Sequence, residues 1–369
     1  MRLILLILMS VCYADVIHVP ADYSTIQEGI DAANQDDIVV VSPATYEENI
    51  VIDKTITLTS LALFNTETET IIDSLDTWFD WGTTQYEITN DSILTTIIDG
   101  SQPVNDSLGS TILIKAADDD CISPKILGFT ITGGKGTLID RSFINPDTGD
   151  TTYIPQHLGG GLFSYVTTPD IRYNYFYNNG SMDIEEGGAV YAVSDPDDCP
   201  FPTRSRCEID EIDFSHNFFR DNTSRLGKIL ANRWFDDEIN LSNCVFDYYC
   251  EATGNPNMYW VKVDEPDEVD YEETTSDGCP IDWDVWVSPT GSDDGEGSES
   301  QPFQTIGWAL SVVVGTEDNP VTINLTEGTF SPSTNGESFS INMVSNVNLI
   351  GQGEELTILD AEQTGRVIT

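Results

Sequence analysis

Basic residues are scarce in this sequence. Its 369 residues include 15 Lys and Arg against 63 Asp and Glu, which gives a formal net charge of −48. A surface with this charge repels nucleic acid and anionic lipid, so both are disfavoured as partners. The charge is compatible with a saline habitat or with calcium binding, although most carboxylates on such a chain are solvated surface groups.

Long apolar segments are also missing. The apolar run at residues 3–9 follows the positive Arg2 and is followed by a small-residue site at residues 12–14. This order is typical of a secretory signal peptide, and the run is too short to cross a bilayer. A buried first strand is the alternative. We predict a signal peptide at residues 1–14, no transmembrane segment, and a mature protein that is secreted or held at the cell surface.

Cysteine is the third scarce residue. Removal of residues 1–14 leaves six cysteines, an even number that suits disulfides in an oxidising compartment. Cys199 and Cys207 are close enough in sequence to close a loop, as are Cys244 and Cys250. The sequence leaves the pairing open, and a free buried thiol is the alternative for Cys244. The spacings do not resemble a zinc site.

The sequence does contain a repeat between residues 126 and 249. Its four units begin at Ile126, Ile171, Phe214 and Leu241. The fifth position after each start is apolar, and the third and eighth positions carry asparagines at Asn174, Asn179, Asn217 and Asn222. Such short units must stack on one another to bury their apolar faces, which predicts a solenoid. Asparagines in stacked turns can adopt left-handed angles and bond to the next coil; unrelated turn asparagines of a sandwich are the alternative.

The solenoid has a predicted beginning near residue 24. The segment Ser24-Thr25-Ile26-Gln27 reads as a capping box, and Ile26, Ile30 and Ala33 share one face of a short helix. We expect this helix to cover the open end of the solenoid. Strands of the first coils are predicted at residues 38–41, 50–52, 56–58 and 70–73.

A second beginning of the same kind follows. Thr25-Ile26 aligns with Thr305-Ile306, and residues 70–73 align with residues 357–360. The intervening residues 264–277 are acidic and poor in aliphatic side chains, which favours a linker. We predict a β-helix domain at 15–263, an acidic linker at 264–282, and the first coils of a truncated second β-helix at 283–369.

These motifs resemble a known superfamily. The run Ile-Leu-Gly-Phe-Thr-Ile-Thr-Gly-Gly at 126–134, with the glycine-led strands at 159–163 and 187–191, is similar to right-handed parallel β-helix, or pectin-lyase-like, proteins and to repeats of bacterial surface proteins. Residues 286–306 resemble the start of a β-helix group that includes some pectate lyases. The resemblance implies an all-β, right-handed parallel β-helix with a short N-terminal capping helix, followed by the start of a second β-helix. This fold carries lyases, hydrolases, esterases and adhesins alike.

The resemblance also implies a possible chemistry. Lyases of this kind abstract a proton beside a uronate carboxylate that Ca²⁺ neutralises, and a Lys or Arg acts as base. The candidate bases are Arg225, Lys228 and Arg233. The candidate calcium ligands are Asp118, Asp119, Asp120, Asp195, Asp197, Asp198, Asp293, Asp294 and Glu296. Solvated turns are the commoner role of such acidic clusters, and none of these residues matches a family active-site motif.

Two tryptophans bear on ligand binding. Trp78 and Trp81 lie in a predicted lateral loop, where they either form a platform for sugar rings or pack the loop onto the solenoid. The sequence as a whole predicts a secreted or cell-surface repeat protein that binds polysaccharide or another cell-surface ligand without catalysis. A Ca²⁺-dependent polysaccharide lyase is the alternative, and a purely structural spacer is the third reading.

Overall fold

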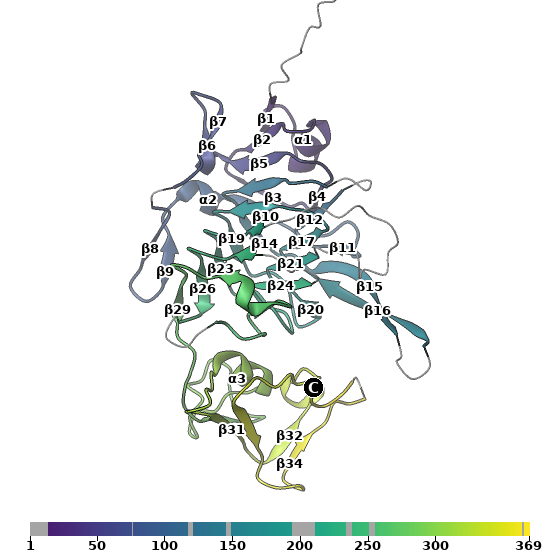
Figure 1. The fold of residues 1–369 in the computed structure, drawn as a ribbon, viewed down its shortest axis with the longest axis vertical. Coiled ribbons are helices and arrows are strands. Elements are labelled where there is room, and N and C mark those ends of the chain that lie inside the picture. Colours follow the sequence, from purple (N-terminus) through teal and green to yellow (C-terminus); the bar gives the residue numbers. More distant parts are fainter. Residues whose placement is uncertain are drawn as a thin grey trace, which may run out of the picture.

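The computed structural model describes residues 14–75, 77–116, 121–144, 149–193, 211–233, 238–250, 255–363 and 365–369. Within them the chain forms the predicted right-handed parallel β-helix, which Figure 1 shows as strands stacked along the long axis. No helix among these residues is long and apolar enough to cross a membrane. The predicted signal peptide lies outside the described residues, except for Ala14.

Three parallel sheets make up the first solenoid. The first sheet contains β1 (Val16–Val19), β2 (Ile38–Val41), β5 (Thr57–Ser60), β13 (Lys125–Leu127), β18 (Asp170–Arg172), β22 (Glu211–Asp213), β25 (Glu238–Asn240) and β28 (Val269–Asp270). The second contains β3 (Ala44–Tyr46), β10 (Thr96–Asp99), β14 (Thr130–Thr132), β19 (Tyr175–Tyr177), β23 (Phe218–Arg220), β26 (Val245–Tyr248) and β29 (Thr275–Gly278). The third contains β4 (Ile50–Ile52), β12 (Ile112–Lys115), β17 (Leu162–Tyr165), β21 (Val190–Val193), β24 (Leu230–Arg233) and β27 (Val261–Lys262).

Lateral elements interrupt the coils. They are η1 (Leu61–Leu63), β6 (Phe64–Asn65), β7 (Thr70–Ile71), β8 (Phe79–Trp81), β9 (Tyr86–Ile88), α2 (Asp91–Thr95), β11 (Leu108–Gly109), β15 (Gly136–Ile144), β16 (Thr151–Leu158), β20 (Ile184–Glu186) and η3 (Pro266–Glu268). The strand predicted at residues 70–73 belongs to this group, because β7 pairs antiparallel with β6 in a hairpin instead of joining a coil.

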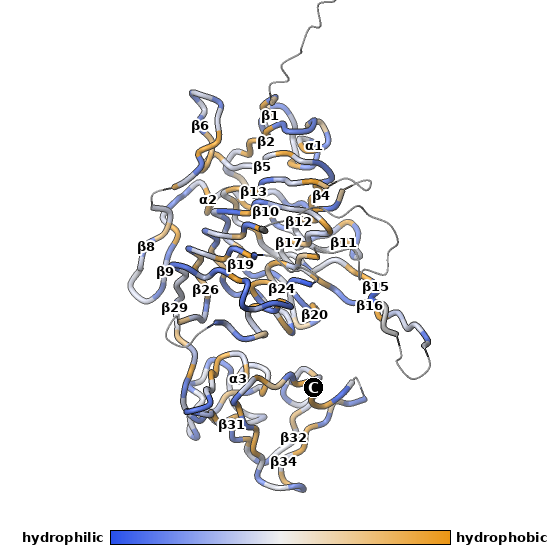
Figure 2. The backbone as a smooth tube through the Cα atoms, viewed as in Figure 1, coloured by the Kyte–Doolittle hydropathy of each residue, from blue (hydrophilic) through white to orange (hydrophobic). Residues whose placement is uncertain are grey.

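The repeat alignment matches the strand register. Ile126 pairs with Ile171, and Ile131 pairs with Phe176, which in turn pairs with Phe219. Each of these side chains is buried in one continuous core. The rings of Phe176 and Phe219 stack with centroids 5.2 Å apart. Figure 2 shows orange hydrophobic positions and blue hydrophilic positions interspersed through the stacked coils.

Asparagine ladders join successive coils. The carboxamide oxygen of Asn217 accepts from the backbone N–H of Asn174 at 2.9 Å, and the amide nitrogen of Asn217 donates to the carbonyl of Ile171 at 2.6 Å. Asn179 and Asn222 form a second ladder in the same way. The ladders satisfy buried backbone groups where the chain turns between sheets, so each asparagine is fixed by the coil on either side.

The left-handed turn residue is not the asparagine itself. The positive φ angles fall one position earlier, at Tyr173 (60°) and His216 (54°). The expectation that the asparagines adopt left-handed angles is therefore corrected: they supply the hydrogen bonds, while the preceding residue supplies the turn.

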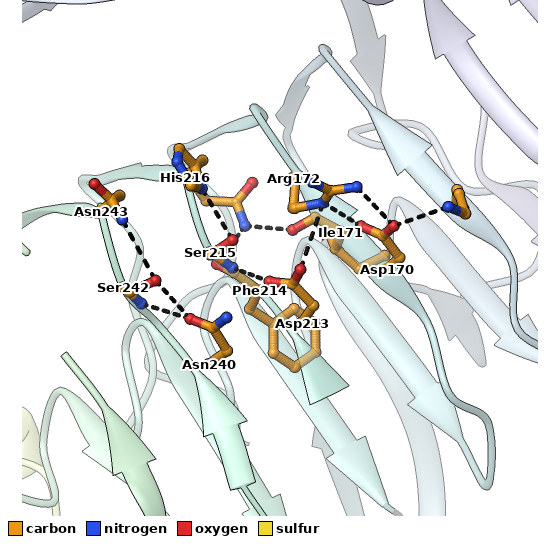
Figure 3. A network of polar contacts seen from close by, with 12 residues as sticks. Asp170, Ile171, Arg172, Asp213, Phe214, Ser215, His216, Asn240, Ser242 and Asn243 are labelled. Carbon is orange, nitrogen blue, oxygen red and sulfur yellow. Dashed lines mark hydrogen bonds and ion pairs between the residues drawn. The ribbon is translucent and has the colours of Figure 1, made fainter. Parts of the chain in front are cut away.

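A polar network runs across the outer face of the same turns (Figure 3). Asp170 accepts two hydrogen bonds from Arg172, at 2.6 and 2.9 Å, and lies 3.4 Å from Lys125 on the preceding coil. Arg172 also reaches Asp213 on the next coil at 3.5 Å. These charges link β13, β18 and β22 at the surface, where ion pairs contribute little stability, so the buried ladders carry more of the register.

The candidate pairing of Cys244 with Cys250 is wrong. Cys250 forms a disulfide with Cys279, not with Cys244, and the bridge joins the ends of the paired strands β26 and β29. Cys244 is a free, buried thiol at a ladder position, where its sulfur accepts from the N–H of Asn217 at 3.5 Å. The Cys244 side chain lies in the hydrophobic core of the first solenoid. Cys121 is disulfide-bonded, and Cys199 and Cys207 lie outside the described residues.

Residues 264–282 are more structured than the predicted linker. They contain η3, β28 and β29, and the two strands pair with β25 and β26 of the preceding coil. Most acidic side chains of this segment are exposed, and its backbone continues the solenoid by one coil.

The second start has its own small solenoid. It contains β30 (Val285–Val287), α3 (Ile306–Val312), β31 (Val321–Leu325), β32 (Gly328–Phe330), α4 (Pro332–Asn335), β33 (Val347–Ile350) and β34 (Thr357–Leu359). Strands β30, β31 and β33 form one parallel sheet, and β32 pairs parallel with β34. A separate core lies among them.

The two starts share one capping device. Thr25 is the N-cap of helix α1 (Ile26–Ala32), one residue later than predicted. The first two N–H groups of this helix donate to the Glu48 carboxylate. Helix α3 begins at Thr305, and its first two N–H groups donate to the Glu337 carboxylate. A remote carboxylate thus satisfies the free N–H groups of each helix.

We expect Asn217→Ala to lower the free energy of unfolding by about 3 kcal/mol, because it leaves several buried backbone groups without partners. Urea titration followed by circular dichroism measures this change. Asn348→Ala, at an exposed position of β33, is the matched control and should shift stability by less than about 0.5 kcal/mol. Equal losses in the two variants would contradict the role of the ladder.

Candidate functional site

A cavity of about 870 Å³ lies where the last coils of the first solenoid meet the second. One wall comes from residues 221–228 and from β26, with Asp247 and Tyr248. The facing wall comes from the turn at 293–296, the start of α3 and the segment 336–342. Residues far apart in sequence therefore share one cavity.

Direct contacts join these walls. The Tyr259 hydroxyl donates to the carbonyl of Asn342 at 2.9 Å, and the Trp260 indole donates to the carbonyl of Ser311 at 2.7 Å. Arg225 donates to the carbonyl of Phe339. Tyr259 is also part of the hydrophobic core of the second solenoid. The cavity is therefore bounded by packed elements on both sides.

Lys228 lies between two tryptophan rings at this junction. Its ammonium is 4.5 Å from the ring centre of Trp260 and 4.7 Å from that of Trp308, and it is 3.3 Å from the Ser311 hydroxyl. Burial lowers the pKa of Lys228 to about 8, and the nearby Asp247 acts in the opposite direction. The two rings also favour the charged form, because an ammonium is attracted to aromatic faces.

Asp247 is the carboxyl group of the first solenoid whose charge acts on Lys228. Burial raises the pKa of Asp247 to about 7, and the charge of Asp221 adds to the effect. One oxygen of Asp247 accepts from the N–H of Asp221 at 3.1 Å. A carboxyl and an amine that both titrate near neutrality thus face the same cavity.

The opposite wall contains two carboxylates with structural contacts. Asp293 accepts hydrogen bonds from the N–H groups of Gln304 and Thr305 and from the Thr305 hydroxyl. Glu337 caps α3, and burial raises the pKa of Glu337 to about 7 although two N–H groups bind its charged form. Both carboxylates hold the first turn of α3, and that turn positions Trp308.

Five of the sequence candidates line this cavity. They are Arg225, Lys228, Asp293, Asp294 and Glu296. Across the described part of the chain, no three His, Cys, Asp or Glu side chains are arranged to hold a metal ion. The other six calcium candidates, Asp118, Asp119, Asp120, Asp195, Asp197 and Asp198, lie outside the described residues.

Arg233 lies elsewhere, in a buried ion cluster. Its guanidinium binds Glu186 at 2.8 Å, and Arg141 and Lys262 bind the same carboxylate at 2.6 and 3.0 Å. Burial alone would raise the pKa of Glu186, but the hydrogen bonds from Arg233 and Arg141 hold it well below its usual range. Arg233 is thus engaged with Glu186 and is not among the residues that line the cavity.

The two tryptophan candidates differ from each other. Trp78 is 3% exposed and packs edge-on against Tyr173 and Phe218, so it fastens the lateral loop to the solenoid. Trp81 is 52% exposed at the end of β8 and contacts the edge of Tyr86. Neither ring lines the cavity.

Several cavity residues were not anticipated from the sequence. Asp247, Tyr248, Trp260 and Trp308 belong to no motif, and 48 residues separate Trp260 from Trp308 in the numbering. Trp308 has a buried indole N–H with no hydrogen-bond partner among the described residues. A lysine flanked by tryptophans could have been found only by placing the second start against the end of the first solenoid.

The family comparison matches the second start alone. A family model described as a protein of unknown function, DUF1565, matches residues 289–364. No curated protein matches the chain.

Three solved structures illustrate the matches by fold. A pectin methylesterase from Aspergillus niger is 12% identical with a TM-score of 0.32, and the alignment covers 97% of this chain and 90% of that one. An alginate lyase from Paenibacillus sp. str. FPU-7 is 11% identical with a TM-score of 0.31, and the alignment covers 96% of this chain and 97% of that one. The pectin methylesterase PemA from Erwinia chrysanthemi is 11% identical with a TM-score of 0.29, and the alignment covers 97% of this chain and 93% of that one.

The lowered pKa of Lys228 gives a testable dependence of stability on pH. A lysine whose folded-state pKa of about 8 lies below its model value of 10.5 costs stability while it is charged, and this cost is lost as the pH rises between these values. We expect wild type to gain stability relative to Lys228→Met from about pH 8 to about pH 10.5. Paired urea titrations measure the difference. If the difference in unfolding free energy between wild type and Lys228→Met does not change with pH, the tryptophan rings offset the cost of burying the Lys228 ammonium.

Proposed function

We propose that this protein is an extracytoplasmic β-helix protein that binds a carbohydrate chain, without catalysis, in the cavity between the end of its first solenoid and the start of its second. The observation that carries the proposal is a cavity lined by aromatic and polar side chains, among them Trp308, whose buried indole N–H has no hydrogen-bond partner in the described part of the chain. The volume of about 870 Å³ falls within the range of small-ligand sites, about 300–1,000 Å³.

The cavity wall suits a sugar. Tyr248 and Trp308 are partly exposed and meet edge to face at 5.9 Å, which offers apolar surface beside polar groups. Ser338, Ser340 and Asn342 supply donors and acceptors on the same wall. A pyranose ring has both an apolar face and hydroxyl groups, so this mixture matches its chemistry.

Two further observations support a location outside the cytoplasm. The order of charge, apolar run and small residues at 1–14 is that of a secretory signal. The Cys250–Cys279 disulfide joins neighbouring coils and is the kind of bond that persists in oxidising compartments.

Trp308→Phe tests the proposal, since phenylalanine retains an aromatic ring and part of the packing and removes the N–H donor. We expect this variant to bind glycans about 5- to 10-fold more weakly, the effect of one lost hydrogen bond. A glycan array identifies ligands of the wild type, and titration calorimetry on the best ligand measures the change.

Two variants serve as controls. Trp283→Phe alters an exposed tryptophan outside the cavity and should leave affinity unchanged. Trp81→Ala tests the exposed ring on the lateral hairpin. If Trp81→Ala abolishes binding and Trp308→Phe has no effect, the ligand site lies on the hairpin and the cavity proposal is wrong.

A polysaccharide lyase is the second candidate, and the lowered pKa of Lys228, which lines the same cavity as Arg225, favours it. Our proposal predicts a flat ultraviolet trace for unsaturated uronate on pectate and alginate, with Ca²⁺ and with chelator. Absorbance that rises only with Ca²⁺ and disappears in Lys228→Met would establish the lyase instead.

A further inference from the structure

The cavity carries more acidic than basic side chains. Its two cations are Arg225 and Lys228, and its acidic residues are Asp221, Asp247, Asp277, Asp293, Asp294, Glu296 and Glu337. Both cations already have partners. Arg225 pairs with Glu185 at 3.0 Å and donates to a carbonyl, and Lys228 lies between tryptophans.

Three of the carboxylates have no such engagement. Within the described ranges, no hydrogen bond or ion pair reaches the side chains of Asp221, Asp294 and Glu296, and all three residues are exposed. By contrast, Asp277 binds Arg220 and the N–H of Tyr86. The three unengaged carboxylates are therefore available to a ligand at the cavity mouth.

The protein itself places a primary ammonium in this cavity. The Lys228 ammonium is held by two indole faces and a serine hydroxyl, in the electrostatic field of Asp247 and Asp293. Aromatic faces next to carboxylates accommodate this cation, and Asp294 and Glu296 line the same cavity. The same chemistry suits a second ammonium supplied by a ligand.

We propose that the cavity selects an amino-sugar oligosaccharide with free ammonium groups, which Asp294, Glu296 and Asp221 pair with while Trp308 donates to a sugar hydroxyl. This inference rests on the proposed carbohydrate binding and specifies its substrate class. It disfavours uronate polymers, because their carboxylates would meet the unpaired carboxylates of the cavity.

Titration calorimetry of the purified protein with three hexasaccharides tests the class. The probes are a glucosamine hexamer, an N-acetylglucosamine hexamer and a galacturonate hexamer, all at low salt. We expect the glucosamine hexamer to bind at least about 10-fold more tightly than the N-acetylated one, with no binding of the galacturonate hexamer.

Charge variants locate the effect. The double variant Asp294→Asn/Glu296→Gln should weaken binding of the glucosamine hexamer by about 10-fold and leave the affinity for the N-acetylated hexamer unchanged. The control is Glu354→Gln/Glu355→Gln, which removes two exposed charges outside the cavity. This control is needed because a protein with a net charge of −48 attracts any polycation.

Each contrary outcome has a distinct meaning. Equal affinity for the glucosamine and N-acetylated hexamers, with both weakened by Trp308→Phe, would overturn the amino-sugar inference and leave carbohydrate binding intact. Tight binding of the galacturonate hexamer would also overturn it. Equal losses in the two double variants, or equally tight binding of a lysine hexapeptide, would assign the effect to bulk charge. No binding of any hexasaccharide would reject both proposals.

Discussion

In-register stacking of successive coils is the constraint on which this structure depends. A coil of three short strands cannot bury its apolar face alone, so each coil requires a neighbour at the same register. The paired core residues Ile131, Phe176 and Phe219 meet this requirement by apolar contact. The asparagine ladder meets it by hydrogen bonding, because Asn217 bridges backbone groups of two coils at once. A shift of one residue in strand register would turn the core side chains and the ladder asparagines to the opposite face of the strand.

The same stacking explains where variation is tolerated. Loops and hairpins such as β15–β16 leave the coils at the turns, where no core contact is lost. Cys244 replaces asparagine at one ladder position, and its sulfur still accepts a hydrogen bond from the coil before. The ladder position thus requires a buried hydrogen-bond acceptor, and the Cys244 sulfur supplies one.

The second solenoid start turns the end of the first into a site. Residues of the first solenoid's last coils, including Tyr259, pack into the second core, and Trp308 comes to lie over Lys228. The capping carboxylate Glu337 differs from its counterpart Glu48 in being buried beside the cavity, and burial raises the pKa of Glu337. The capping carboxylate of the second start therefore also contributes to the wall of the cavity.

The sequence by itself determined the coil pattern, the ladder positions and the existence of two starts, because these depend on local periodicity that is repeated along the chain. It also indicated Arg225, Lys228, Asp293, Asp294 and Glu296, although as members of separate clusters. Only the tertiary structure placed those five together, paired Cys250 with Cys279, assigned Arg233 to Glu186 and gave residues 264–282 a coil. The physical reason is that the cavity, the disulfide, the Arg233 ion pair and the added coil depend on contacts between coils and between the first and second solenoids. No local sequence pattern specifies such contacts.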